Sequence, residues 1–269
     1  MITCGLMRLA QSPLFRALLL VSLVLGPIAA APAQLSVSLV PDSVSLAGGA
    51  LLAAASLGLH ASTQEMPVDI DRVNGLDRLA MFGYSRGLDV ASDIGMYAAM
   101  AAPLALALGI SQDQAFAAGV IYLEVMSRAF FGKNTLKFLL PRVRPWVYLA
   151  PVTGSVPEVW EGNDSFPSGH STMVFAAAAF GVTVAALDLP SGSPWFFPFA
   201  ATEVSLAAIT ASLRVFSGMH FMTDVIAGAA LGTAIGIALP LIHTTWTGGS
   251  VGKSVPAVRF EVPILAFAL

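Results

Sequence analysis

The chain has 269 residues, of which 56% are hydrophobic and only 11% are charged, and its mean hydropathy is +0.78. Soluble domains carry about 25% charged residues, so this composition excludes an ordinary soluble domain and predicts an integral membrane protein. The net charge of −3 gives no reason to expect a nucleic-acid partner.

Residues 1–33 have the three parts of a secretory signal. Arg8 and Arg16 supply positive charge, an apolar run follows at 17–30, and small residues precede Gln34. We expect either a cleaved signal peptide or an uncleaved first membrane helix. The single cysteine, Cys4, lies in this segment, so a mature chain without it has neither a disulfide nor a cysteine metal site.

Six later segments are apolar and about long enough to span a bilayer, which takes about 20 residues. We therefore predict an all-α, integral membrane helical bundle with about six transmembrane helices. We divide the chain into an N-terminal helix and polar surface loop (34–90), a membrane-embedded core (91–243) and a C-terminal tail (244–269). The candidate helices lie near 43–61, the weakest, and near 91–110, 114–131, 171–188, 194–213 and 222–243.

Small residues recur every fourth position on the last of these segments, at Gly228, Gly232 and Gly236. This spacing favours close approach of a neighbouring helix. Two apolar segments also carry charges. Glu124 and Arg128 are four residues apart and predict a structural ion pair, whereas Glu203 has no assigned role.

Two cations, Lys137 and Arg144, flank a proline-containing stretch after the segment at 114–131. A continuous helix would turn them the same way, but Pro141 and Pro145 make a continuous helix doubtful. We then expect them to meet a phosphate from a helix end and the loop after it, with Arg144 clamping two oxygens and Lys137 acting as a point charge. Arg142 is a third local cation. The alternative is an ordinary positively charged flank of a membrane helix.

A second motif, Pro167-Ser168-Gly169-His170, comes directly before an apolar run. The N–H groups at a helix start bind anions, Gly169 permits close approach to a ligand, and Ser168 adds a hydroxyl. His170 is a candidate general acid near neutral pH. The alternative is a helix cap with an incidental histidine.

The third motif contains Arg214, His220 and Asp224. Positions i and i+4 of a helix face the same way, so we expect Asp224 to fix the tautomer of His220 and leave its other nitrogen free to attack phosphorus. Arg214 can reach the same phosphate. The alternative is a polar pair at a helix start, favoured there by the helix dipole.

Together the three motifs predict a two-step displacement in which His220 forms a phosphohistidine. His170 protonates the departing alkoxide and then helps to activate water. The three cations Lys137, Arg144 and Arg214 and the Ser168-Gly169 backbone hold the phosphate oxygens as charge develops. No carboxylate cluster indicates a metal, so we expect a reaction without metal or cofactor.

These residues resemble the type 2 phosphatidic acid phosphatase superfamily. Its pattern is Lys, six residues, Arg-Pro; then Pro-Ser-Gly-His; then Ser-Arg, five residues, His, three residues, Asp. The sequence matches it except at Leu213, where the family usually has serine. The resemblance implies an all-helical bundle, metal-independent phosphohistidine chemistry, and lipid substrates such as phosphatidate, phosphatidylglycerol phosphate, polyprenyl pyrophosphate or lipid A phosphates.

Family members in membranes usually work on the outer face, which here implies the periplasmic face of a bacterial inner membrane. After a cleaved signal, three crossings before Lys137 would place that residue in the cytoplasm. An outer-face site is therefore simplest if 43–61 does not fully cross. We expect a bilayer environment and a lipid phosphate substrate, and the sequence leaves the oligomeric state open. Alternative functions are a lipid phosphotransferase using the same histidine and a non-catalytic protein that binds lipid headgroups.

Overall fold

The computed structural model describes residues 33–58, 68–110, 112–149, 162–190 and 192–246. The predicted signal segment up to residue 32 and the tail from residue 247 lie outside the described residues. Two short strands, β1 (Ala33–Leu35) and β2 (Thr244–Trp246), pair antiparallel. The helices are α3 (Leu39–Ser56), η1 (Ile70–Arg72), α4 (Gly75–Arg78), α5 (Arg86–Ala101), η2 (Ala102–Leu108), α6 (Gln112–Leu139), α7 (Pro145–Tyr148), α8 (Gly169–Asp188), α9 (Phe196–Phe216) and α10 (Met222–Ile242).

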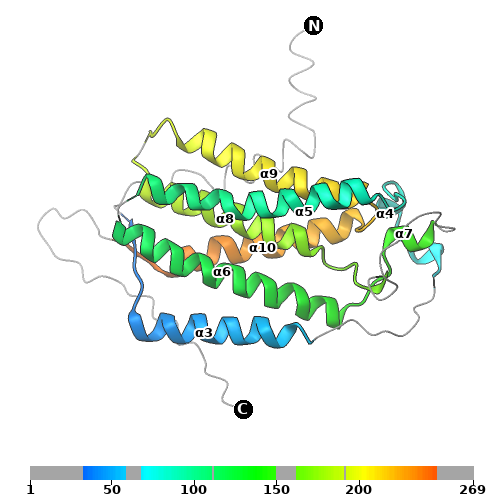
Figure 1. The fold of residues 1–269 in the computed structure, drawn as a ribbon, viewed down its shortest axis with the longest axis horizontal. Helices are drawn as coiled ribbons and strands as arrows, with labels where there is room; N and C mark the ends of the chain where they lie inside the picture. Colours follow the sequence, from blue (N-terminus) through cyan, green and yellow to red (C-terminus); the bar gives the residue numbers. More distant parts are fainter. Residues whose placement is uncertain (1–32, 59–67, 111, 150–161, 191, 247–269) are drawn as a thin grey trace, which may run out of the picture.

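The long helices run side by side along one axis, with α3 at one edge and α4 and α7 at one end (Figure 1). Helix α8 is central, because it packs against α6, α9 and α10 and most of its side chains are buried. The predicted all-α bundle is confirmed.

Within the described residues, four helices, α6, α8, α9 and α10, are long and apolar enough to cross a membrane. The chain is therefore an integral membrane protein. The two other predicted segments differ from this pattern. The apolar part of α3 is shorter, at Val40–Ser56, and the segment near 91–110 is divided between α5 and the 3₁₀ helix η2.

The glycines of α10 allow its backbone to lie directly against α8. A Cβ atom placed on Gly228 would be 2.5 Å from the carbonyl oxygen of Ser168, and one on Gly232 would be 2.2 Å from that of Thr172. At Gly236 the corresponding distance, to the carbonyl oxygen of Ala176, is 2.4 Å. No side chain fits at these positions, so the predicted close approach is confirmed, and it places the starts of α8 and α10 side by side.

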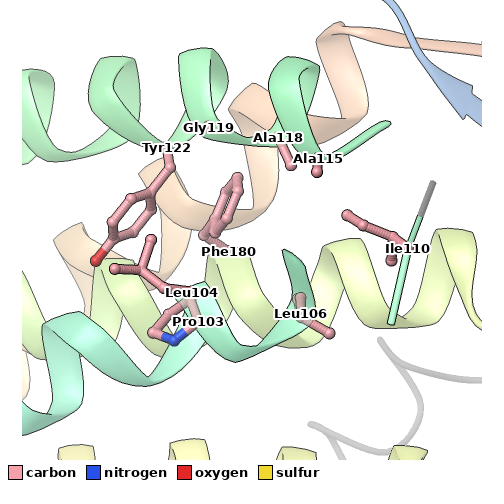
Figure 2. A pocket seen from close by; sticks show the side chains of 9 residues that line it. All are labelled: Pro103, Leu104, Leu106, Ile110, Ala115, Ala118, Gly119, Tyr122 and Phe180. Atoms are coloured by element: carbon pink, nitrogen blue, oxygen red, sulfur yellow. The ribbon is translucent and has the colours of Figure 1, made fainter. Parts of the chain in front are cut away.

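A small apolar pocket of about 50 Å³ lies between η2, α6 and α8 (Figure 2). Pro103 and Leu104 line it from η2, and the rings of Tyr122 and Phe180 lie 4.9 Å apart beside it. None of the residues lining it belongs to the three sequence motifs. The pocket is a gap in the packing between helices, away from the motif residues.

Charged side chains within the bundle have two different environments. The predicted ion pair is present, with Arg128 Nη1 3.3 Å from Glu124 Oε2. Glu203 is fully buried beside Gly181, and its carboxylate oxygens accept no hydrogen bond from the described residues.

Candidate active site

The three motifs meet at the end of the bundle where α6 and α9 finish and α8 and α10 begin (Figure 1). The helices that end at the motifs run in the opposite direction to those that begin there. The motifs at the ends of α6 and α9 therefore lie beside the motifs at the starts of α8 and α10. Most of the predicted site residues are buried here. The buried ones are Lys137, Arg144, Ser168, Arg214, His220 and Asp224.

The stretch after α6 is fixed to the segment that leads into α8. As its prolines predict, α6 ends at Leu139, and Arg144 caps the short helix α7. The backbone of Arg142 donates to the carbonyl of Asn163 at 3.0 Å, and that of Arg144 donates to the carbonyl of Gly162 at 2.7 Å. The first two motifs are thus joined by main-chain hydrogen bonds.

Lys137 is held in place by Asp164. Its Nζ lies 3.1 Å from Asp164 Oδ2 and donates to the carbonyl oxygen of the same residue at 2.5 Å. One helical turn earlier, the Lys133 side chain lies against Gly169, with its Cδ 3.2 Å from where a Cβ would be. Sequence reasoning missed Lys133, although two lysines four residues apart in an apolar helix were a usable signal.

His220 has one nitrogen fixed by a hydrogen bond. Its Nδ1 lies 2.7 Å from the carbonyl oxygen of Ser165. A carbonyl only accepts, so we assign the proton to Nδ1 and leave Nε2 with a free lone pair. That Nε2 lies 3.4 Å from Arg144 Nη1. Burial, followed by the positive charges of Arg144, Arg214 and Lys137, lowers the pKa of His220 well below its ordinary value, so the imidazole is neutral at pH 7.

Asp224 lies near this imidazole without bonding to it. Its Oδ2 is 3.9 Å from His220 Nδ1, which is too far for a hydrogen bond, and instead accepts from the Ser165 hydroxyl at 2.6 Å and the Phe221 N–H at 2.9 Å. The sequence analysis expected the carboxylate itself to fix the tautomer. The geometry differs because α10 begins at Met222, so His220 precedes the helix and the i,i+4 rule does not apply to it.

Arg142 bridges two buried carboxylates, those of Asp77 and Asp224. It donates to Asp224 Oδ1 at 2.5 Å and to Asp77 Oδ2 at 2.7 Å. Asp77 also accepts from the N–H and hydroxyl of Thr223. Burial alone would raise the pKa of Asp77, but the bonds from Thr223, Arg142 and Asn74 outweigh it and lower that pKa. Asp77 belongs to the predicted polar surface loop, and no local sequence pattern indicates that it is buried here.

Arg214 is held by the first turns of α5. Its Nη1 donates to Asp89 Oδ1 and to the Ser92 hydroxyl, the latter at 2.7 Å. The neighbouring Ser212 is exposed and donates to the carbonyl of Ala208. It therefore points away from the site and does not replace the serine that the family has at position 213.

The second motif begins α8. Ser168 caps the helix, with its Oγ accepting from the Ser171 N–H, and its own N–H donates to the carbonyl of Asp224 at 3.0 Å. His170 lies in the first turn, and its Nε2 is 2.7 Å from Asp93 Oδ1 of α5. Asp93 is a further residue that the sequence analysis did not single out.

Comparisons with known proteins find relatives of the region that contains the three motifs. Residues 118–247 match the family model of the PAP2 superfamily, a stretch that contains all eight predicted site residues. Over 73 residues the chain is 34% identical to the lipid A 1-phosphatase of Porphyromonas gingivalis, an alignment that covers 27% of this chain and 15% of that protein.

Among solved structures, the chain is similar to the first transmembrane PAP2 type phosphatidylglycerolphosphate phosphatase from Bacillus subtilis. The sequence identity is 19%, the TM-score is 0.46, and the alignment covers 74% of this chain and 93% of that one. The family match and the three motifs identify residues 118–247 as a PAP2 superfamily region.

Proposed function

We propose that this protein is a membrane phosphatase that hydrolyses a lipid phosphate or pyrophosphate monoester through a phosphohistidine at His220. The observation that carries the proposal is the state of that histidine. Its Nδ1 is engaged by the Ser165 carbonyl, and its neutral Nε2 lies beside the Arg144 guanidinium. A buried, neutral imidazole with one fixed nitrogen is a competent nucleophile.

In the first step the Nε2 of His220 forms a bond to phosphorus as the bond to the leaving oxygen breaks. Charge on the transferring phosphoryl group is then balanced by Lys137, Arg144 and Arg214, whose charges all act on His220. The Ser168 N–H is already bonded to the Asp224 carbonyl, so we assign the further donors to the N–H groups of Gly169 and His170 at the start of α8. The positive charge that develops on the imidazole is stabilised by the Ser165 carbonyl and the nearby Asp224.

The electron pair of the broken bond stays on the leaving oxygen, which takes a proton from the imidazolium form of His170. In the second step water attacks phosphorus, His170 accepts its proton, and the bond to His220 breaks to release inorganic phosphate. Asp93, 2.7 Å from His170 Nε2, orients this imidazole. We expect no step to use a metal, because the charges of Lys137, Arg144 and Arg214, which all act on His220, could balance that of the phosphoryl group.

The membrane location supports a lipid substrate. The site lies where four membrane-spanning helices begin or end, so a phosphate at the headgroup level of the bilayer could enter while its chains stay in lipid. The Porphyromonas relative is a lipid A 1-phosphatase, and lipid A is therefore one member of the test panel. We place the site on the periplasmic face of a bacterial inner membrane, in agreement with the signal-like start of the chain.

The test is phosphate release by detergent-purified protein from phosphatidate, phosphatidylglycerol phosphate, polyprenyl pyrophosphate and lipid A, with and without EDTA. We expect EDTA-resistant release from at least one lipid and none from His220→Ala. Release that survives in His220→Ala would contradict the nucleophile assignment. Loss of the lipid phosphate only when an acceptor alcohol is present, without release of inorganic phosphate, would favour a phosphotransferase with the same intermediate.

A further inference from the structure

A second group of chemically reactive side chains lies far from the predicted phosphatase site. Asp42 of α3, Glu124 of α6 and His243, the residue after α10, place one ligand atom each within 4.8 Å of one another. His243 and Asp224 stand at opposite ends of α10, which is about 30 Å long for its 21 residues. The group is therefore at the other end of the bundle.

The buried carboxylate of Glu124 is the least expected member. The residue is 0% exposed, and its two oxygens accept no hydrogen bond from the described residues. Arg128 lies 3.3 Å from Oε2 but donates elsewhere, to the Ser45 hydroxyl and the carbonyl of Glu124 itself. A buried carboxylate without hydrogen bonds is costly unless a charge compensates it, and one partly exposed guanidinium compensates only one side.

The histidine is oriented as a metal ligand. Its Nδ1 lies 2.9 Å from the carbonyl oxygen of Leu239, so Nδ1 carries the proton and Nε2 has the free lone pair. That Nε2 is 3.4 Å from Asp42 Oδ1 and 3.9 Å from Glu124 Oε2. Histidines that bind metals commonly donate their other ring N–H to a carbonyl or carboxylate in this way.

The backbone also holds the ligand-bearing segments together. The Ser36 N–H donates to the carbonyl of His243 at 2.8 Å, next to the β1–β2 pair. The Ser38 N–H donates to Asp42 Oδ2, which leaves Oδ1 facing the histidine. Three segments that are far apart in sequence thus present one nitrogen and two carboxylate oxygens to a common point.

We propose that Asp42, Glu124 and His243 bind a divalent transition metal ion, with Zn²⁺ as the reference ion. Tetrahedral Zn²⁺ with ligands at about 2.0–2.1 Å keeps its ligand atoms about 3.3 Å apart. The 3.4 Å and 3.9 Å separations approach that value, and the Asp42 and Glu124 ligand atoms lie within 4.8 Å of each other, so the three side chains must close in on a bound ion. A nitrogen ligand disfavours Mg²⁺ and Ca²⁺, which prefer oxygen.

The proposed role is to fix α3 to the bundle. Among the described elements, α3 packs chiefly against α6, and Asp42 lies in its first turn. A metal shared by Asp42, Glu124 and His243 would join α3, α6 and the end of α10. This inference does not depend on the proposed phosphatase function, since it concerns other residues and a structural role.

The experiment uses the full chain purified in detergent with an affinity tag that contains no histidine. The protein is stripped with a chelator, and Zn²⁺ binding is measured by calorimetry and by elemental analysis after desalting. We expect one Zn²⁺ per wild-type chain and none in His243→Ala. His170→Ala is the matched control, because it removes a histidine from the opposite end and should retain the ion.

Two further measurements guard against misfolding. Asp42→Asn is a milder change that should raise the Kd for Zn²⁺ at least about tenfold, and Zn²⁺ should raise the Tm of wild type but not of His243→Ala. Wild-type protein that binds no Zn²⁺ would overturn the proposal and leave the three residues as an ion-pair cluster. Equal binding by His243→Ala and His170→Ala would also overturn it. If EDTA lowers phosphatase activity in wild type but not in His243→Ala, the loss arises from this site.

Discussion

Gly228→Ala tests whether the contact between α8 and α10 sets the geometry of the site. The added Cβ would lie 2.5 Å from the Ser168 carbonyl oxygen, whereas ordinary contact begins at 3.4 Å. The start of α8, with Ser168 and His170, must therefore move away from α10 and Asp224 by about 1 Å. A displacement of about 1 Å at a catalytic site costs about 100-fold in rate, and overpacking costs about 1–3 kcal/mol in stability.

Gly236→Ala is the variant that separates an effect on the position of the site residues from an effect on the stability of the protein. Its Cβ would be 2.4 Å from the Ala176 carbonyl oxygen, a similar clash, but about 12 Å further from the site along the helix. We expect both variants to lose a similar amount of thermal stability. The kcat/KM for phosphate release should fall about 100-fold in Gly228→Ala and far less in Gly236→Ala.

Gly119→Ala in α6 serves as the control, because a Cβ there meets nothing within 4 Å. Its activity and Tm should match or slightly exceed those of wild type, since alanine is the better helix former. Initial rates and thermal unfolding would be measured on all three variants in the same detergent. Equal activity losses in Gly228→Ala and Gly236→Ala, or none in Gly228→Ala, would refute the reasoning.

Three further predictions follow from the charges around His220. Because its pKa is lowered first by burial and then by Arg144, the acid limb of kcat/KM should lie below about pH 6.5; an acid limb at or above that value in wild type would contradict this. In the unfolded chain His220 binds a proton more readily than in the folded protein, so the free energy of unfolding should fall as the pH drops below about 6.5. Unfolding measured at several pH values should show a steeper fall for wild type than for His220→Gln. Arg142→Met should lower the free energy of unfolding by about 3–5 kcal/mol, because Asp77 and Asp224 are left buried without their cation. Adding Asp77→Asn to this variant should restore part of the loss, as measured by thermal unfolding. Unchanged stability in both variants would argue against a stabilising role for the contacts of Arg142 with the two carboxylates.

The structure brings the three sequence motifs together because each one lies next to a helix end, where chain direction and spacing limit the geometry. Pro141 and Pro145 indicated correctly that no continuous helix joins Lys137 to Arg144, although α6 extends to Leu139, beyond the predicted segment 114–131. The glycines at 228 and 232 predicted the close contact of α10 with another helix, although the sequence did not identify α8 as its partner.

The supporting residues were harder to predict because they act across long sequence separations. Asp77 is 65 residues from Arg142 and 146 from Thr223, and no local pattern reveals such contacts. Asp89 and Asp93 stand on α5 and reach Arg214 and His170 from another helix. The bond from His220 to the Ser165 carbonyl was also hidden, since a main-chain oxygen leaves no signature in sequence.

The central claim is that phosphate passes through a covalent bond to His220. The most direct measurement is rapid acid quenching of the enzyme during turnover of its best lipid substrate, followed by prompt digestion and mass spectrometry. The account predicts a phosphoryl group on the peptide that contains His220, and none on that peptide in His220→Ala. Turnover by wild type with that peptide unmodified, together with undiminished activity of His220→Ala, would contradict it.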